Sequence, residues 1–193
     1  MAPVETVGAP CRAASLETKP RGRDRRPALI VPDPDETGPL RQVYGTFPSG
    51  VVAVCALRDA APVGIVASSF VAVSMNPPLV SVCVQHTSTT WPFLADCPRV
   101  GLSVLGTTHD RACRQIASKT GDRFAGIGYT ATGEGAVLLH GAAAWLDCSI
   151  DTVVSAGDHD LVLLRVAAMR PHEEVAPLVF HGSRLHALSA LAS

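Results

Sequence analysis

Residues 64–84 read GIVASSFVAVSMNPPLVSVCV, and this stretch says more about the fold than any other part of the chain. Residues 64–67 have the apolar composition of a buried strand. Residues 79–84 alternate between apolar and small or polar side chains, which is the period of a half-buried strand. Asn76-Pro77-Pro78 predicts a turn, because proline fixes φ and lacks an N–H donor. The stretch therefore predicts two strands. The chain passes from the first toward the second through residues 68–70, here called the crossing, and then through the turn at 76–78.

The crossing between these strands is rich in hydroxyl groups. Ser68 and Ser69 stand side by side, and Phe70 adds an aromatic face. Backbone N–H groups and hydroxyls in such a segment are available to a ligand that carries phosphate or carbonyl oxygens. An ordinary turn has the same composition, so these residues alone leave both interpretations open.

Length and composition narrow the class of protein. A chain of 193 residues suits one domain with a substantial core. Its hydrophobic content is 47% and its mean hydropathy is +0.25, yet no run approaches the roughly 18 apolar residues of a membrane span. A net charge of −1 gives no reason to expect nucleic acid or a membrane surface as partner. No secretory signal is visible at the N-terminus.

The six cysteines are scattered and form no C-x-x-C pair. Disulfide frameworks and zinc sites both need clustered or patterned cysteines, so we expect neither, and we expect no metal. Cys55, Cys83 and Cys148 lie in apolar strand-like runs, where cysteine behaves as a small hydrophobe. The pattern predicts reduced thiols in a cytoplasmic protein.

The chain divides into a tail and a folded domain. Residues 1–39 hold seven of the fifteen prolines and no aromatic residue, which predicts a flexible tail. The basic run at 19–26, KPRGRDRR, indicates either a solvated segment or a contact to phosphate or a partner protein. Residues 40–193 are predicted to form a single domain.

Short alternating segments dominate this domain. We expect strands at 51–57, 64–67, 80–84, 99–105, 137–140, 143–154, 159–169 and 178–181, and helices at 90–96 and 109–119. Thr90 is the expected N-cap of the first helix, with Pro92 in its first turn. Many short antiparallel strands with two small helices predict a mainly β fold, a closed barrel with helical additions.

Four stretches together resemble one family. They are Phe47-Pro48-Ser49-Gly50-Val51, the stretch 64–84, the pair Arg123-Phe124, and Gly157-Asp158-His159. In this order they resemble the short-chain flavin reductase family, whose members include the reductases of two-component flavin monooxygenases. The resemblance runs from about Leu40 to Leu188. It implies an FMN-binding split β-barrel, antiparallel and Greek-key-like, with a few short helices.

The resemblance also implies the contacts of the flavin. The matching positions are Ser49, Ala67, Ser68, Ser69, Phe70, Val73, Ser74, Gln85, Ser88, Thr90, Arg123 and Phe124. The hydroxyls of the loop before the first helix would meet the phosphate at that helix N-terminus, unless they serve as turn and cap groups. Many relatives carry a lysine or arginine in this loop, whereas this chain has none at 86–90. Arg123 and Phe124 have the alternative roles of surface arginine and core phenylalanine.

His159 is the expected catalytic residue, and the resemblance places it, with Gly157 and Asp158, near the nicotinamide. Hydride transfer from nicotinamide C4 to flavin N5 needs two stacked rings at near-contact distance and a polar group that orients the carboxamide. A neutral imidazole suits that task. We expect the carboxylates of Asp158 and Asp160 to point away from this imidazole, as alternation along a strand requires, with no second histidine nearby.

The function implied is that of a homodimeric NAD(P)H:flavin oxidoreductase, which reduces FMN or FAD and passes reduced flavin to a separate monooxygenase. Two other functions fit the same fold. One is a flavoprotein oxidase similar to the pyridoxamine-phosphate oxidases, and the other is a non-catalytic flavin- or haem-binding module. The residues do not distinguish FMN from FAD or NADH from NADPH.

Overall fold

The structure is a computed structural model that describes residues 29–189, so Cys11 and the basic run at 19–26 lie outside the described part. Its elements follow one another as α1 (Thr37–Tyr44), β1 (Ser49–Gly50), β2 (Val52–Arg58), β3 (Ala61–Ala67), β4 (Val71–Met75), β5 (Pro78–Gln85), α2 (Trp91–Ala95), β6 (Val100–Val104), the 3₁₀ helix η1 (Thr107–His109), α3 (Asp110–Ile116), β7 (Tyr129–Ala131), β8 (Val137–Leu139), β9 (Ala144–Ala156), β10 (His159–Pro171), β11 (Leu178–His181) and β12 (Arg184–Ala187).

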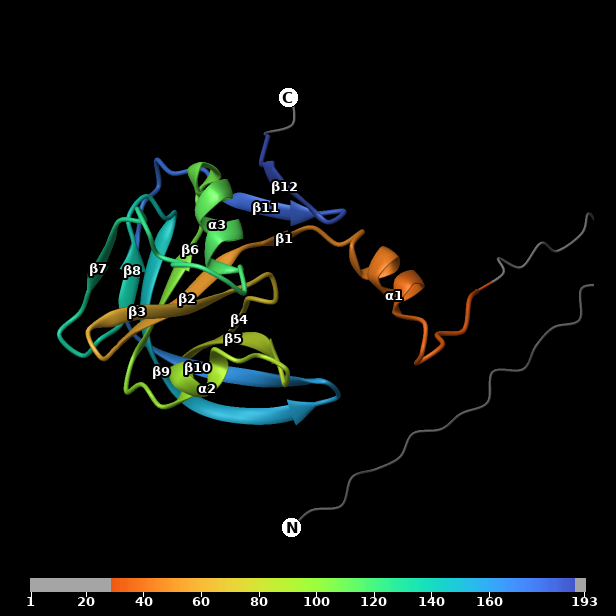
Figure 1. The fold of residues 1–193 in the computed structure, drawn as a ribbon, viewed down its shortest axis with the longest axis horizontal. Helices are drawn as coiled ribbons and strands as arrows, with labels where there is room; N and C mark the ends of the chain where they lie inside the picture. Colours follow the sequence, from red (N-terminus) through yellow and green to blue (C-terminus); the bar gives the residue numbers. More distant parts are fainter. Residues whose placement is uncertain (1–28, 190–193) are drawn as a thin grey trace, which may run out of the picture.

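The strands form three antiparallel sheets (Figure 1). The largest has seven strands in the order β3-β2-β6-β9-β10-β5-β4, while β1-β11-β12 and β7-β8 make two small sheets. The two edge strands of the large sheet, β3 and β4, are consecutive in the chain and joined by residues 68–70. The sheet therefore stays open at this point, and the hydroxyl-rich crossing spans the opening.

Strand β2 separates two hydrophobic cores, because both of its faces are buried. Val52 and Val54 face the larger core, which the inner faces of β5, β6, β9 and β10 complete. Ala53 and Cys55 face the second core, together with Ile116 of α3. Burial of both faces explains why residues 51–56 read as one apolar run rather than as an alternating strand.

The mainly β antiparallel fold with short helices agrees with the prediction. Closure of the barrel is not seen in the described residues, because β3 and β4 are the unpaired edges of the large sheet. The strands expected at 51–57, 80–84, 99–105, 143–154, 159–169 and 178–181 are present within a few residues. The expected strand at 64–67 begins earlier, at Ala61, and the one at 137–140 ends at Leu139. The helix expected at 109–119 is shorter, because α3 ends at Ile116 and the chain turns through Gly121, whose φ is +77°.

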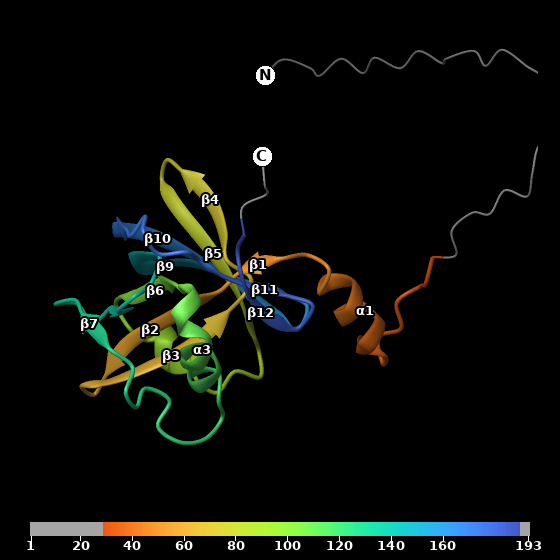
Figure 2. The same cartoon turned by 90° about the horizontal axis from the view of Figure 1, so that it is seen from above.

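Five elements have no counterpart in the sequence prediction: α1, β1, β4, β7 and β12. The 3₁₀ helix η1 shares only His109 with the helix expected at 109–119. The helix α1 begins at Thr37, buries none of its residues and lies beside the sheets (Figure 2). Strand β4 has a mostly exposed edge position, and its short run of apolar and small residues is not among the strands expected from the sequence. In the described part of the chain, no helix is long and apolar enough to cross a membrane.

Candidate functional site

The β3–β4 crossing is held by the side chain of Ser69. Its hydroxyl accepts a hydrogen bond from the N–H of Cys83 at 2.8 Å and donates to the carbonyl of the same residue at 3.2 Å. Strand β4 pairs with β5 only as far as Ser81, so the outer edge of Cys83 has no strand beside it. Ser69 therefore substitutes for a strand at the open part of the sheet. The side chains of Ala67 and Phe70 turn inward, onto the larger core.

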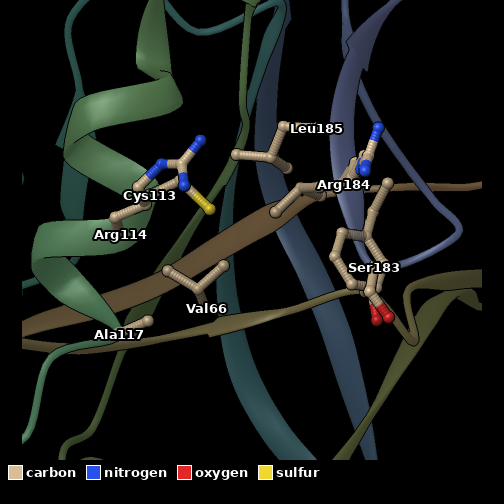
Figure 3. Close-up of a pocket in the computed structure, with 10 residues that line it drawn as sticks. Val66, Cys113, Arg114, Ala117, Ser183, Arg184 and Leu185 are labelled. Atoms are coloured by element: carbon tan, nitrogen blue, oxygen red, sulfur yellow. The ribbon is translucent and has the colours of Figure 1, made fainter.

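Ser68 points the other way and lines a pocket of about 560 Å³. The pocket lies between α3, β2–β3 and the β11–β12 hairpin (Figure 3). Its lining comes from Val51, Val66, Ser68, Cys113, Arg114, Ala117, Phe180, Ser183, Arg184 and Leu185. Most of these side chains are apolar, and the polar groups at the rim are hydroxyls and two guanidinium groups. This volume and lining are typical of a small-molecule site.

Arg114 and Arg184 stand on opposite sides of this pocket, one on α3 and the other on β12 (Figure 3). Arg114 is paired with Asp110, one turn earlier in the helix, at 2.8 Å. Both arginines are exposed to solvent. The rim of the pocket thus carries the cations that the loop at 86–90 lacks, and cations of this kind bind phosphate groups well.

Cys113 contributes a thiol to the same wall. Burial raises the pKa of this thiol, and the carboxylate of Asp110 raises it further. A raised pKa keeps the group neutral near pH 7 and lowers its nucleophilicity. Cys113 therefore acts as an apolar surface of the pocket.

Sequence analysis did not identify Cys113, Arg114, Ser183, Arg184 or Leu185 as site residues. One signal was available for the hairpin residues. Gly182-Ser183 is a two-residue turn between short apolar segments, and both residues have positive φ, +56° and +62°. Such a turn predicts a β-hairpin. Its place over α3 follows only from the packing.

The loop after β5 is ordered by hydrogen bonds within the chain. Thr90 occupies the N-cap position of α2, but its hydroxyl makes no capping bond, which corrects the predicted role. The capping bond comes from the hydroxyl of Ser88, which accepts the N–H of Trp91 at 3.1 Å. The hydroxyl of Thr90 instead accepts a hydrogen bond from the guanidinium of Arg123 at 3.1 Å. Arg123 also donates to the carbonyl of Ile116, so it joins α2 to the segment after α3.

Phe124 lies beside this arginine but points inward. It is 8% exposed, packs in the second core and meets the ring of Tyr129 edge-on. Val73 and Ser74 are also apart from the pocket, on the edge strand β4, where Val73 is 48% exposed. Ser49 is closer, because it pairs with Phe180, one of the lining residues. Contact of these four residues with a ligand stays a prediction.

His159 begins β10 directly after a turn in which Gly157 has a φ of +67°. Its imidazole is 34% exposed, and its Nδ1 lies 2.7 Å from a carboxylate oxygen of Asp158. The hydrogen bond from His159, followed by its charge, lowers the pKa of the Asp158 carboxyl. Because a carboxylate accepts this bond, Nδ1 carries the hydrogen, and Nε2 is an acceptor whenever the ring is neutral.

The predicted orientation of the two carboxylates is wrong for Asp158. That residue belongs to the turn and not to the strand, so alternation does not apply and its side chain reaches back to His159. Asp160 lies in the strand and does point away, but it meets a second histidine, His86, at 2.9 Å. Among the described residues no group of three or more potential metal ligands occurs.

Strand β5 brings the predicted residues together. Gln85, at its end, pairs with His159 on β10, and the N–H of Ser88 donates to the carbonyl of Gln85. Cys83, two residues earlier, holds the crossing through Ser69. The hydroxyl-rich crossing lies on one edge of β5 and the His159 turn lies on the other, so both are close to the end of this strand, where the loop at 86–90 begins. The pocket lies beside Ser68.

The fold and this arrangement define a small antiparallel β-protein with a nucleotide-sized pocket at the open edge of its sheet. Residues 44–189 match the flavin reductase like domain, and the chain belongs to that family of oxidoreductases. This confirms the resemblance seen in the sequence.

Three known proteins illustrate the similarity. A flavin reductase of Pseudomonas putida is 35% identical over 143 residues, which cover 74% of this chain and 84% of that protein. The flavin-dependent monooxygenase reductase subunit HsaB of Rhodococcus jostii is also 35% identical, over 74% of this chain and 73% of its own. The NADH:FAD oxidoreductase of Streptomyces globisporus, solved with NAD and FAD fragments, superposes with a TM-score of 0.79 at 33% identity, covering 86% of this chain and all of that one.

Proposed function

We propose that this protein is an NAD(P)H:flavin oxidoreductase that reduces FMN or FAD by hydride transfer and releases reduced flavin to a separate monooxygenase. One observation carries the proposal: the flavin reductase match spans 44–189, and within it the flavin-type crossing and the His159 turn meet on β5. The reductase subunit name of the Rhodococcus jostii relative supports the separate monooxygenase.

The pocket beside Ser68 fits a flavin. Its apolar walls, among them Val66 and Leu185, suit a flat aromatic ring, and burial of such a ring is favourable. Arg114 and Arg184 at the rim would hold the phosphate, since guanidinium groups bind phosphate through paired hydrogen bonds. Ser68 would reach the polar edge of the ring. The bound flavin supplies the hydride acceptor, and this chain supplies its position.

His159 is the proposed catalytic residue. Asp158 fixes the imidazole through Nδ1, so Nε2 is left to accept an N–H of the nicotinamide carboxamide. No covalent nucleophile or strong acid is needed, because the reaction depends on alignment of two rings. Pre-alignment of two reactants contributes roughly 7–11 kcal/mol to lowering a barrier.

The protein acts as a homodimer in this proposal. Edge strand β4 exposes apolar side chains, with Met75 at 93% and Val71 at 56%, and Val153 and Val154 on β9 are each 46% exposed. Apolar residues gathered on an edge strand favour a protein interface over a free surface. A second subunit seated there would also bring Val73 and Ser74 toward its partner's flavin.

The compartment we propose is the cytoplasm. All five described cysteines are free thiols. Burial raises the pKa of Cys55 and of Cys148 to about 12, so these two stay neutral and unreactive. Unpaired thiols of this kind suit a reducing compartment.

The function is tested by following NADH and NADPH oxidation by the purified protein, with FMN, FAD and riboflavin added in turn. Many turnovers of free flavin establish the reductase and fix both preferences. A flavin that copurifies tightly and oxidises an added amine supports the oxidase instead. Flavin binding without nicotinamide turnover supports the non-catalytic module and removes the role of His159.

A further inference from the structure

His86 stands outside the pocket and outside the flavin contacts that the family resemblance implies, yet it joins two parts of the site. Its backbone N–H donates to the carbonyl of Asp158 at 3.0 Å. Its Nε2 lies 2.9 Å from a carboxylate oxygen of Asp160. One residue of the loop after β5 is therefore bonded to the residue before His159 and to the residue after it.

The side-chain bond lies on the face opposite to the His159 imidazole. His159 and Asp160 are neighbours at the start of β10, so their side chains point to opposite faces of the sheet. The His86 imidazole meets Asp160 on that far face, where the two side chains are 41% and 24% exposed. His86 can thus influence a ligand beside His159 only through the backbone of the turn.

The loop that starts at His86 carries Ser88, which caps α2, and Thr90, which is held by Arg123. Ser88 and Thr90 are expected to contact flavin, and His159 is proposed to contact nicotinamide. Movement of this loop relative to the turn would therefore change the distance between the two bound rings. Hydride transfer is sensitive to such a change, because a displacement near 1 Å costs roughly a hundredfold in rate.

We propose that His86 and Asp160 form a clamp that positions the loop 86–90 against the His159 turn, and so sets the distance between the flavin and nicotinamide rings. This inference rests on the proposed reductase function. It assigns His86 and Asp160 as positioning residues, which act through His159 and the loop without touching either ring.

The test compares two substitutions of one residue. His86→Gln places an amide N–H close to the position of Nε2 and retains the bond to Asp160, whereas the shorter His86→Asn does not reach it. We expect His86→Asn to lower the single-turnover rate of flavin reduction at saturating NADH about tenfold to a hundredfold. Flavin Kd and the KM for NADH should change less than about threefold, and His86→Gln should stay within threefold of the wild type.

Asp160→Ala provides the second arm, because alanine has no acceptor at the position of the carboxylate. It should lower the same rate as much as His86→Asn, and the double variant should be no slower than either single variant, because one bond is removed in all three. Hydrogen exchange of the free protein should show faster exchange at the amides of His86 and Ser88 in His86→Asn, in the Asp160 variant and in the double variant, but not in His86→Gln. This readout needs no ligand and no activity.

The outcomes separate the two proposals. If the wild type oxidises neither NADH nor NADPH with any flavin, the reductase function fails, and with it the role of the clamp. If the wild type is active and His86→Asn reduces flavin at the wild-type rate, the clamp alone is overturned. Equal losses in His86→Gln and His86→Asn, or a loss of flavin affinity that matches the loss of rate, overturn it as well.

Discussion

In the proposed reaction, His159 aligns the nicotinamide and does not bind the flavin. Its imidazole is held by Asp158 at the start of β10, while the pocket for the flavin is lined by other residues. We expect His159→Ala to lower kcat/KM for NADH roughly ten- to hundredfold and to leave flavin affinity nearly unchanged, because only the alignment of the nicotinamide is lost. Steady-state kinetics and flavin fluorescence titration measure the two quantities.

A matched control for this variant is His140→Ala. His140 is also exposed, and its side chain contacts Thr130, away from the pocket and the His159 turn. It should keep wild-type kinetics. A parallel loss of flavin binding in His159→Ala, or unchanged kinetics, would show that His159 has a different role.

The Asp158 carboxyl gives a prediction about pH. Its pKa is lowered in the folded protein by the hydrogen bond from His159. A carboxyl with a lowered folded pKa stabilises the fold above its unfolded pKa of about 3.9, and the contribution is lost as pH falls through the folded pKa. An NMR titration should place the Asp158 pKa below about 3.9 in the wild type and nearer to that value in His159→Ala. An identical pKa in both proteins would argue that the contact does not persist in solution.

At the scale of elements, β6 and β8 approach more closely than any side chain allows. A Cβ on Gly101 of β6 would clash with the backbone carbonyl oxygen of Val137 on β8. Both residues are fully buried or nearly so, and the obstructing atom belongs to the backbone, so neither side can move aside cheaply. Gly101→Ala should therefore lower the free energy of unfolding by about 3 kcal/mol.

Chemical denaturation measures this loss, and Gly133→Ala is the control. Gly133 has nothing within 4 Å of the added Cβ and no positive φ, so its substitution should change stability by less than about 1 kcal/mol. Equal midpoints for the two variants would mean that β6 and β8 are farther apart than the structure has them.

Elements with a buried face could be predicted from sequence, and elements without one could not. The alternation at 80–84 identified β5 because Val80, Val82 and Val84 all face the larger core. Helix α1 buries none of its residues. Strand β4 reads VAVSM, which alternates between larger apolar and small residues, but its side chains are mostly exposed and it is not among the strands expected from the sequence. The side-chain orientation of Asp158 was predicted wrongly for another reason. Alternation describes strands, and Asp158 lies in a turn.

For the whole molecule, the exposed apolar residues of β4 and β9 give a prediction about assembly. Met75→Glu places a charge in the proposed dimer interface, which is costly to desolvate. We expect the dimer Kd to rise at least tenfold, as measured by sedimentation equilibrium. Met169→Glu changes an equally apolar residue, 78% exposed, on β10 beyond Arg165, the last residue that pairs with β5, and should leave the dimer intact. A monomeric wild type, or equal weakening by both variants, would contradict the proposed interface.

The sequence by itself determined the family, the mainly β fold, the crossing at 68–70 and the place of His159 at a strand start. These features depend on short segments, whose periodicity and order are visible along the chain. Only the tertiary structure decided the pocket, because Cys113, Arg184 and Leu185 come from α3 and from a hairpin some 70 residues later. It also decided that His86 meets Asp160, since strand pairing joins residues 74 positions apart. Contacts between distant segments depend on register and packing, which no local pattern records.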